Sequence, residues 1–490
     1  MRKLYSLLLA VFLFASAVMA QDAAKAIDNL ISKYNENGYF NGSILAADKG
    51  NVVIKKGYGK ANFEWNIPNA SDTKFRLGSI TKQFTSMLIM QLVEKGKLKL
   101  DDKLSDLLPY YRKDTGEKVT LHMLLTHTSG IPSYTNRPDF GAKISRMPYK
   151  PDDFIKEYCS GDLEFEPGSS IAYNNSGYFI LGAIIEHITG MTYEEALKKN
   201  ILEPLGMKNT GYDVTENIIE KRASGYEKRS TGYRNASFLD MSLPYAAGSL
   251  YSTVEDLLIW DKALQTDKLL KPELKEKLFG KYKKLGEMYY GYGWMTGKRF
   301  NGKDSLNVIT HGGGINGFNT INYMIPEAGQ YVIIFSNAGG APLGKMADQI
   351  INIMNGKKET EPQKSLVQIL WKSIETEGTE SAIKKFKELK GKKNEYSYNE
   401  GEINLLGYDL LGAGKTDQAL EVFKLNMEEY PKSFNVYDSY GEALLKKGMK
   451  EEAAANYKKS LELNPGNEGA AKKLEEMGYK DFRKPEVKLS

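Results

Sequence analysis

The most informative segment of this chain reads Phe75-Arg76-Leu77-Gly78-Ser79-Ile80-Thr81-Lys82. An apolar stripe at helical spacing follows Ser79 and ends at Gly96, which predicts a helix that opens at Ser79. Residues three apart on a helix share one face. The sequence therefore places the amine of Lys82 within reach of the Ser79 hydroxyl.

The spacing S-x-x-K carries little information alone, because it also occurs at Ser71 and Ser381. Of the three serines, only Ser79 opens a predicted helix, where backbone N–H groups lack helical partners. A lysine with its usual pKa of about 10.4 is almost fully protonated at neutral pH. We therefore expect Lys82 to act as a base only in a partly desolvated site.

A tyrosine in a Y-x-N pattern is a candidate second group for proton transfer. The pattern begins at four tyrosines: Tyr39, Tyr134, Tyr173 and Tyr233. We favour Tyr173, because the turn residues Glu166-Pro167-Gly168 precede it and an apolar helix is predicted from Gly177. Tyr134 is the alternative.

A histidine and three glycines, His311-Gly312-Gly313-Gly314, directly follow a predicted strand. Consecutive glycines let a backbone approach a substrate closely, so this edge can offer an N–H to an oxyanion, and His311 a hydrogen bond or charge. The alternative is a glycine-rich turn. His122 and His127 are interpreted as structural, and we predict no metal site and no cofactor, since no metal-ligand pattern is present.

Predicted strands lie towards both ends of the first 356 residues. They cover residues 42–47, 51–57, 291–294, 306–310, 318–324 and 331–336. Helices are predicted before them, over about 24–38, and after them, from about Leu343 to Met354. Residues 79–250 read mainly as helices and loops. This order predicts one sheet built from both ends of the domain, with an inserted helical lobe.

The composition changes after Gly356, where a polar linker leads into a Lys- and Glu-rich tail. Six residue pairs in the tail match at a spacing of 34: Gly407/Gly441, Leu411/Leu445, Gly414/Gly448, Ala419/Ala453, Phe423/Tyr457 and Pro431/Pro465. This period resembles tetratricopeptide repeats, helical pairs that offer a groove to a protein or peptide partner. We expect the main domain to span 21–356 and the linker and repeats 357–490.

The N-terminus reads as a secretory signal peptide over residues 1–20. Arg2 and Lys3 precede an apolar run that ends in small residues at Ala20, and the run is shorter than the ~20 residues of a membrane-spanning helix. We expect a periplasmic or secreted mature chain without a transmembrane anchor. Its formal charge falls from +5 to +3 without Arg2 and Lys3, and its charges are interleaved, so nucleic acid is not an expected partner. Cys159 is the only cysteine, which excludes an intrachain disulfide.

Four segments together resemble the class C beta-lactamase-like serine hydrolases, relatives of penicillin-binding proteins, DD-peptidases and esterases. They are the Ser79 segment, Leu124-Leu125-Thr126-His127-Thr128-Ser129-Gly130-Ile131, Pro167-Gly168 with Tyr173-Asn174-Asn175-Ser176-Gly177-Tyr178, and His311-Gly312-Gly313. The resemblance covers about residues 24–355. It implies an α/β fold of the α+β kind: an antiparallel sheet flanked by helices, beside a mainly helical lobe, with the site between them.

The resemblance also implies roles for single residues. Ser79 is the expected nucleophile, Lys82 and Tyr173 share the proton transfers, and Asn175 binds Lys82 and a substrate amide. The N–H groups of Ser79 and Gly314, beside Gly313, form the expected oxyanion hole.

One residue departs from the family pattern. His311 stands where beta-lactamases of this family carry a lysine that helps to hold the substrate carboxylate. We therefore expect a hydrolase of small-molecule or peptide substrates, such as D-amino-acid peptides or small esters. A true beta-lactamase, and a non-catalytic protein that acts through its repeats, are the alternatives.

Overall fold

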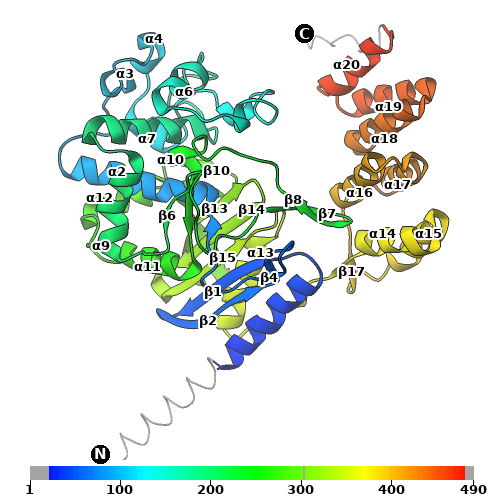
Figure 1. Cartoon of the computed structure of the whole chain (residues 1–490), viewed down its shortest axis with the longest axis horizontal. Helices are drawn as coiled ribbons and strands as arrows, with labels where there is room; N and C mark the ends of the chain where they lie inside the picture. The colour runs from blue at the N-terminus through cyan, green and yellow to red at the C-terminus, as the bar shows by residue number, and fades with distance from the viewer. Residues whose placement is uncertain (1–20, 302–303, 481–490) are drawn as a thin grey trace, which may run out of the picture. The chain divides into compact units, whose positions relative to one another are not determined.

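The computed structural model describes residues 21–301 and 304–480 and divides them into two compact units (Figure 1). Of the described residues, the first unit contains those up to Glu227 and those within Asn235–Glu361, and the second contains Lys228–Arg234 and those from Pro362 onward. The predicted signal peptide lies outside the described residues. Within those residues, no helix combines the length and hydropathy needed to span a membrane.

The first unit is built on an eight-stranded antiparallel sheet with the order β10-β11-β12-β13-β14-β15-β1-β2 (Figure 1). Its strands are β1 Gly42–Asp48, β2 Asn51–Tyr58, β10 Lys283–Leu285, β11 Met288–Tyr290, β12 Met295–Asn301, β13 Asp304–Ile315, β14 Phe318–Ile325 and β15 Gln330–Ser336. The early and late strands meet where β1 pairs with β15, from Gly42↔Ser336 to Ala47↔Tyr331. The prediction of one sheet built from both ends of the domain is confirmed.

Helices cover both faces of this sheet. All seven residues of β15 are buried, and because successive side chains alternate between faces, the strand contributes to two cores. Val332 and Ile334 pack with the helix over residues 21–36 and with α13 (Leu343–Met354), whereas Ile333 and Phe335 pack on the side of α2 (Thr81–Glu94) and α11 (Val254–Leu264). The predicted helix from Leu343 to Met354 is confirmed.

A mainly helical lobe is inserted between β2 and β10, as predicted. Its other helices are α3 Leu104–Leu107, α4 Lys113–Gly116, α5 Leu121–Leu125, α6 Pro151–Tyr158, α7 Asn175–Thr189, α8 Tyr193–Leu197, the π-helix η4 Lys198–Leu202, α9 Glu203–Leu205, α10 Tyr245–Gly248 and α12 Pro272–Leu278. Short strands of this region outside the main sheet are β3 Lys60–Asn62, β4 Ile67–Pro68, β5 Phe75–Arg76, β6 Gly211–Tyr212 and β9 Leu250–Ser252. A hairpin of β7 Tyr226–Arg229 and β8 Gly232–Asn235 leaves the lobe, and its residues Lys228–Arg234 belong to the second unit. Helix α7 is deeply buried in this lobe, with ten buried residues in succession from Ser176 to Ile185.

The second unit is mainly helical. Its elements are α14 Leu366–Glu377, α15 Thr379–Leu389, α16 Glu400–Gly412, α17 Thr416–Glu429, α18 Phe434–Lys447, α19 Lys450–Leu463 and α20 Glu468–Glu476, with the short strands β16 Lys364–Ser365 and β17 Tyr396–Ser397. Apolar side chains from all seven helices form one core.

Three local predictions differ from the structure. The strand predicted over 291–294 is wrong. Glycines alternate with the buried aromatic residues Tyr292 and Trp294, as apolar residues alternate in a strand, but this segment is a bend between β11 and β12. Strand β13 is longer than the predicted strand over 306–310: it includes His311-Gly312-Gly313-Gly314, so the alternative of a glycine-rich turn is wrong. Ser79 lies in the 3₁₀ turn η1 (Gly78–Ile80), so α2 itself begins two residues later, at Thr81.

Candidate active site

The turn η1 and the first turn of α2 bring Ser79 and Lys82 together. Gly78 has a φ of +55°, a backbone conformation that residues with a side chain rarely adopt. The chain therefore turns sharply at Gly78, immediately before Ser79. Lys82 Nζ lies 3.1 Å from Ser79 Oγ. The expected contact across one helical turn is therefore present.

Lys82 is completely buried, and its amine is held by two groups that can only accept hydrogen bonds. Nζ lies 2.9 Å from Asn175 Oδ1 and 2.8 Å from the carbonyl oxygen of Ala247. Burial lowers the pKa of Lys82 well below its usual value. A neutral amine has two N–H donors and one lone pair. With both donors directed to these acceptors, the lone pair is left to receive the Ser79 proton.

The side chain of Asn175 is oriented by the helical lobe. Asn175 begins α7, whose N-cap residue Asn174 accepts a hydrogen bond from the Gly177 N–H. The Asn175 amide nitrogen Nδ2 donates to Thr135 Oγ1 at 3.1 Å. This donation fixes the amide so that its oxygen faces Lys82.

The two candidate tyrosines occupy different places. The ring of Tyr173 lies 5.0 Å from Lys82 Nζ, and burial raises its pKa while the nearby Ser79 side chain opposes the rise. The Tyr134 hydroxyl donates instead to the Leu243 carbonyl oxygen at 3.1 Å. Of the two, Tyr173 is the tyrosine that the structure brings to the Ser79–Lys82 pair.

Strand β13 runs beside the turn that carries Ser79. A Cβ atom at Gly313 would collide with the carbonyl oxygen of Leu77, and one at Gly78 would lie 2.9 Å from Gly314 N. Thr320 Oγ1 on β14 also donates to that Leu77 oxygen, at 2.7 Å. Glycine at these positions is what lets the strand backbone approach the candidate nucleophile so closely.

His311 is buried in β13, and both of its ring nitrogens are engaged. Nδ1 lies 2.6 Å from the Gly312 carbonyl oxygen, which can only accept, so Nδ1 carries the proton and Nε2 accepts from the Tyr290 hydroxyl at 3.0 Å. Burial is the main cause that lowers the pKa of His311 to about 4. At neutral pH this residue offers a substrate no positive charge.

A cavity of about 150 Å³ opens beside Ser79. Its wall is formed by Gly78, Ser79, Tyr134, Thr135, Phe140, Asn175, Leu239, Leu243, Pro244, Ala247, Gly248, Gly314, Ile315 and Asn316. Apolar side chains dominate and no charged residue is in the wall, so the cavity suits a small, neutral substituent.

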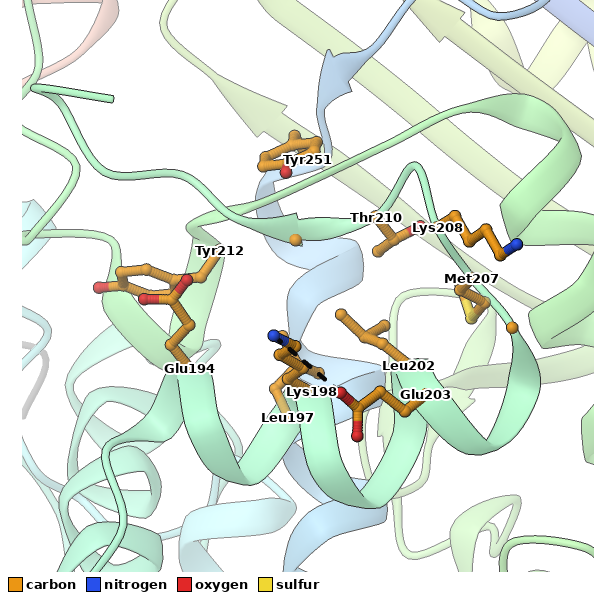
Figure 2. A pocket seen from close by; sticks show the side chains of 12 residues that line it. Glu194, Leu197, Lys198, Leu202, Glu203, Met207, Lys208, Thr210, Tyr212 and Tyr251 are labelled. Atoms are coloured by element: carbon orange, nitrogen blue, oxygen red, sulfur yellow. Dashed lines mark ion pairs between the residues drawn. The ribbon is translucent and has the colours of Figure 1, made fainter. Parts of the chain in front are cut away.

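A larger cavity of about 490 Å³ lies elsewhere in the first unit (Figure 2). Its wall is formed by Glu194, Leu197, Lys198, Leu202, Glu203, Gly206, Met207, Lys208, Thr210, Gly211, Tyr212 and Tyr251. Lys198 and Glu203 form a 4.0 Å ion pair at its rim, and both side chains are largely exposed. None of the candidate catalytic residues lines this cavity, so its size does not make it the reaction site.

Three groups at the site were missed by the sequence analysis. The Ala247 carbonyl and the Thr135 hydroxyl come from distant segments and have no local pattern that would reveal them. His127 was interpreted as structural, but its ring centroid lies 4.4 Å from that of Tyr173. Its position in the segment resembling the family was the only available signal.

Comparisons with known proteins identify the family of the first unit. A family model described as Beta-lactamase matches residues 27–353. The Bacillus subtilis (strain 168) protein PbpX, which carries the name of a penicillin-binding protein, is 30% identical over 343 residues, covering 69% of this chain and 82% of PbpX. The teichoic acid D-alanine hydrolase of Staphylococcus aureus (strain NCTC 8325) is 31% identical over 286 residues, covering 57% and 69% of the two chains.

A solved structure has the same fold over the first unit. The octameric penicillin-binding protein homologue from Pyrococcus abyssi superposes with a TM-score of 0.59 at 32% identity, covering 69% of this chain and 78% of that one. Together with the antiparallel sheet and the family match, this similarity makes the chain a member of the beta-lactamase family of serine hydrolases.

Proposed function

We propose that this chain is an exported hydrolase that cleaves amide or ester bonds through an acyl-enzyme on Ser79. The observation that carries the proposal is the contact between the Ser79 hydroxyl and the buried amine of Lys82. Besides Ser79, the amine contacts Asn175 Oδ1 and the Ala247 carbonyl oxygen, and both can only accept hydrogen bonds. This environment favours a neutral lysine that can take the serine proton.

In the proposed first step, Ser79 Oγ attacks the acyl carbon of the substrate and its proton passes to Lys82. The N–H groups of Ser79 and Gly314 stabilise the oxyanion, and Gly313 permits the close approach of β13. Lys82 and Tyr173 then deliver a proton to the leaving amine or alcohol as the C–N or C–O bond breaks. Water, activated by the same groups, attacks the acyl-enzyme, releases the acid and restores the serine hydroxyl.

The proposed substrates are D-amino-acyl esters or amides and small acyl esters. Two features support this class: the cavity beside Ser79 is small and mainly apolar, and His311 is neutral. The name of the teichoic acid D-alanine hydrolase, a relative, also points to D-alanyl chemistry. Asn175 is proposed to bind a substrate amide. A true beta-lactamase is less well supported, because His311 supplies no charge for the carboxylate of the antibiotic.

We also propose that residues 357–490 form tetratricopeptide-like repeats that recruit a protein or peptide. A Cβ atom at Gly407 would lie 2.5 Å from the Phe423 ring, and one at Gly441 would lie 3.2 Å from the Tyr457 ring. The same small-residue contact therefore recurs 34 residues later, as expected for stacked helical pairs. Export to the periplasm or medium is proposed from the signal-peptide pattern of residues 1–20.

A substrate panel tests the proposed activity. The purified mature chain is assayed with a D-alanyl ester, a D-amino-acid amide, a D-Ala-D-Ala peptide, a short-chain nitrophenyl ester and a chromogenic cephalosporin, beside the Ser79→Ala variant. Turnover of at least one ester or amide that is lost in Ser79→Ala supports the proposal. Equal turnover by both proteins contradicts it, and preferential turnover of the cephalosporin would identify a beta-lactamase. If neither protein turns over any substrate, a non-catalytic role through the repeats is favoured.

A further inference from the structure

We infer that His127 is a positioning residue that holds Tyr173 against the Ser79–Lys82 pair. The inference rests on the proposed function, in which Tyr173 takes part in proton transfer. His127 lies in the loop after α5 and Tyr173 in the loop before α7, so the two residues are distant in sequence but adjacent in space.

His127 holds the chain on both sides of Tyr173. The N–H of Ala172 donates to the His127 carbonyl oxygen at 3.0 Å, and the N–H of Asn174 donates to His127 Nδ1 at 3.0 Å. The two residues that flank the tyrosine are therefore both hydrogen-bonded to this one histidine. Only the second bond depends on the imidazole side chain.

The imidazole ring also packs against tyrosine rings. Its centroid lies 4.4 Å from that of Tyr173, 4.5 Å from that of Tyr290 and 5.1 Å from that of Tyr178. His127 is 1% exposed, and burial is the main cause that lowers its pKa well below the usual value. The ring is thus neutral, and because Nδ1 accepts a bond, the proton is on Nε2.

The Nε2 atom makes no hydrogen bond to Ser79, Lys82 or Tyr173. It is buried and forms no hydrogen bond to any of the residues that the structure describes. The contacts of the imidazole are with the Asn174 N–H and with tyrosine rings. The ring contributes by packing and by accepting the Asn174 N–H, which fixes the backbone immediately after Tyr173.

The backbone of His127 suggests a discriminating substitution. Its φ is +60°, a left-handed conformation that asparagine tolerates better than most residues. The Oδ1 atom of asparagine also occupies the position of Nδ1, since both atoms are bonded to Cγ. His127→Asn therefore keeps an acceptor for the Asn174 N–H, whereas His127→Ala removes it, and both remove the ring.

The experiment measures kcat and KM for the fastest substrate of the panel, per active site titrated with a fluorophosphonate. We expect His127→Ala to lower kcat by at least tenfold with little change in KM, because misplacing a catalytic group acts mainly on the chemical step. His127→Asn should recover most of this loss. His122→Ala, which removes the nearby histidine whose Nδ1 contacts the Tyr292 hydroxyl at 2.7 Å, is the matched control and should keep the wild-type kcat.

The same substitutions in a Tyr173→Phe background separate positioning from general destabilisation. If His127 acts through Tyr173, His127→Ala should change kcat by less than twofold once the Tyr173 hydroxyl is absent. The inference is overturned by any of three results: His127→Ala lowers kcat equally in the wild-type and Tyr173→Phe backgrounds, His127→Asn and His127→Ala lose kcat equally, or His127→Ala keeps the wild-type kcat. Failure of the proposed function has a different signature: Ser79→Ala would retain hydrolysis.

Discussion

Asp261 provides a prediction whose size follows from the structure. This aspartate lies on α11, is completely buried, and accepts a hydrogen bond from Asn322 Nδ2 at 2.6 Å through Oδ1. Its other oxygen has no hydrogen-bond partner among the described residues. Burial raises the pKa of Asp261 to about 8, despite the opposing effect of the Asn322 bond.

The direction of the pH effect follows from proton binding. Between the unfolded pKa of 3.8 and the folded pKa of about 8, the folded chain binds one more proton than the unfolded chain. The free energy of unfolding of the wild type therefore falls as pH rises through this window. At 1.36 kcal/mol per pKa unit, the loss is at most about 6 kcal/mol, because relaxation around the carboxylate reduces it.

The Asp261→Asn variant keeps the shape of the protonated acid but cannot ionise. Relative to the wild type, it should be about equally stable near pH 4 and should gain several kcal/mol by pH 8.5. Urea unfolding followed by tryptophan fluorescence measures this difference, since the adjacent Trp260 stacks on Phe84 at 4.1 Å. Asp101→Asn, at an exposed position, is the control. Parallel pH profiles for the wild type and Asp261→Asn would refute the reasoning.

Three further predictions concern the site. Lys82→Met should lower kcat by about 10²–10⁴-fold in steady-state assays, and an unchanged kcat would contradict the role of Lys82 as a base. Because burial lowers the pKa of Lys82 in the folded chain, the stability of the Lys82→Met variant relative to the wild type should be highest at acidic pH and should decline towards pH ~10. Gly78→Ala adds left-handed backbone strain of about 1–2 kcal/mol and a close contact with Gly314. The kcat of this variant should therefore fall more than that of Gly96→Ala, where φ is +67° and the added Cβ has no neighbour within 4 Å. Equal kcat values for the two variants would contradict this prediction. Leu243→Ala should enlarge the cavity beside Ser79 and shift kcat/KM towards longer acyl esters by about fourfold per methylene. An unchanged chain-length profile for nitrophenyl esters would contradict the proposal that this cavity holds the acyl group of the substrate.

Local patterns explain which parts of the candidate site could be predicted. Ser79 and Lys82 are separated by one helical turn, so their contact depends on little beyond α2 and the turn before it. Tyr173 could be preferred over Tyr134 because a turn and a helix start flank it. By contrast, the carbonyl of Ala247 lies 165 residues from Lys82 in sequence, and only the packed structure brings it to the amine.

His311 shows a different limit. The sequence indicated a histidine beside the site that could offer a hydrogen bond or charge. Its actual state depends on Tyr290, on the Gly312 carbonyl and on burial, all of which are properties of the folded sheet. The role of His127 was missed for the same reason, since ring packing against Tyr173 leaves no periodic pattern.

The strands of the sheet can be predicted where their burial produces a clear apolar pattern in the sequence. Strand β15 is buried on both faces and reads as a continuous apolar run, and a short 3₁₀ turn over Pro326–Ala328 precedes it. The error at 291–294 arose because the two aromatic residues of this segment, Tyr292 and Trp294, alternate with glycines as apolar residues do in a strand. The apolar pattern alone cannot separate a bend from a strand, since the difference depends on how the neighbouring strands β11 and β12 pair.

The acyl-enzyme itself tests the central claim most directly. Intact-mass spectrometry is performed on the wild type and Ser79→Ala after brief exposure to a fluorophosphonate, followed by peptide mapping of the adduct. We predict one added phosphonyl group on the wild type, mapped to Ser79, and no adduct on Ser79→Ala. An unchanged wild-type mass, or equal labelling of the two proteins, would contradict the assignment of Ser79 as the nucleophile.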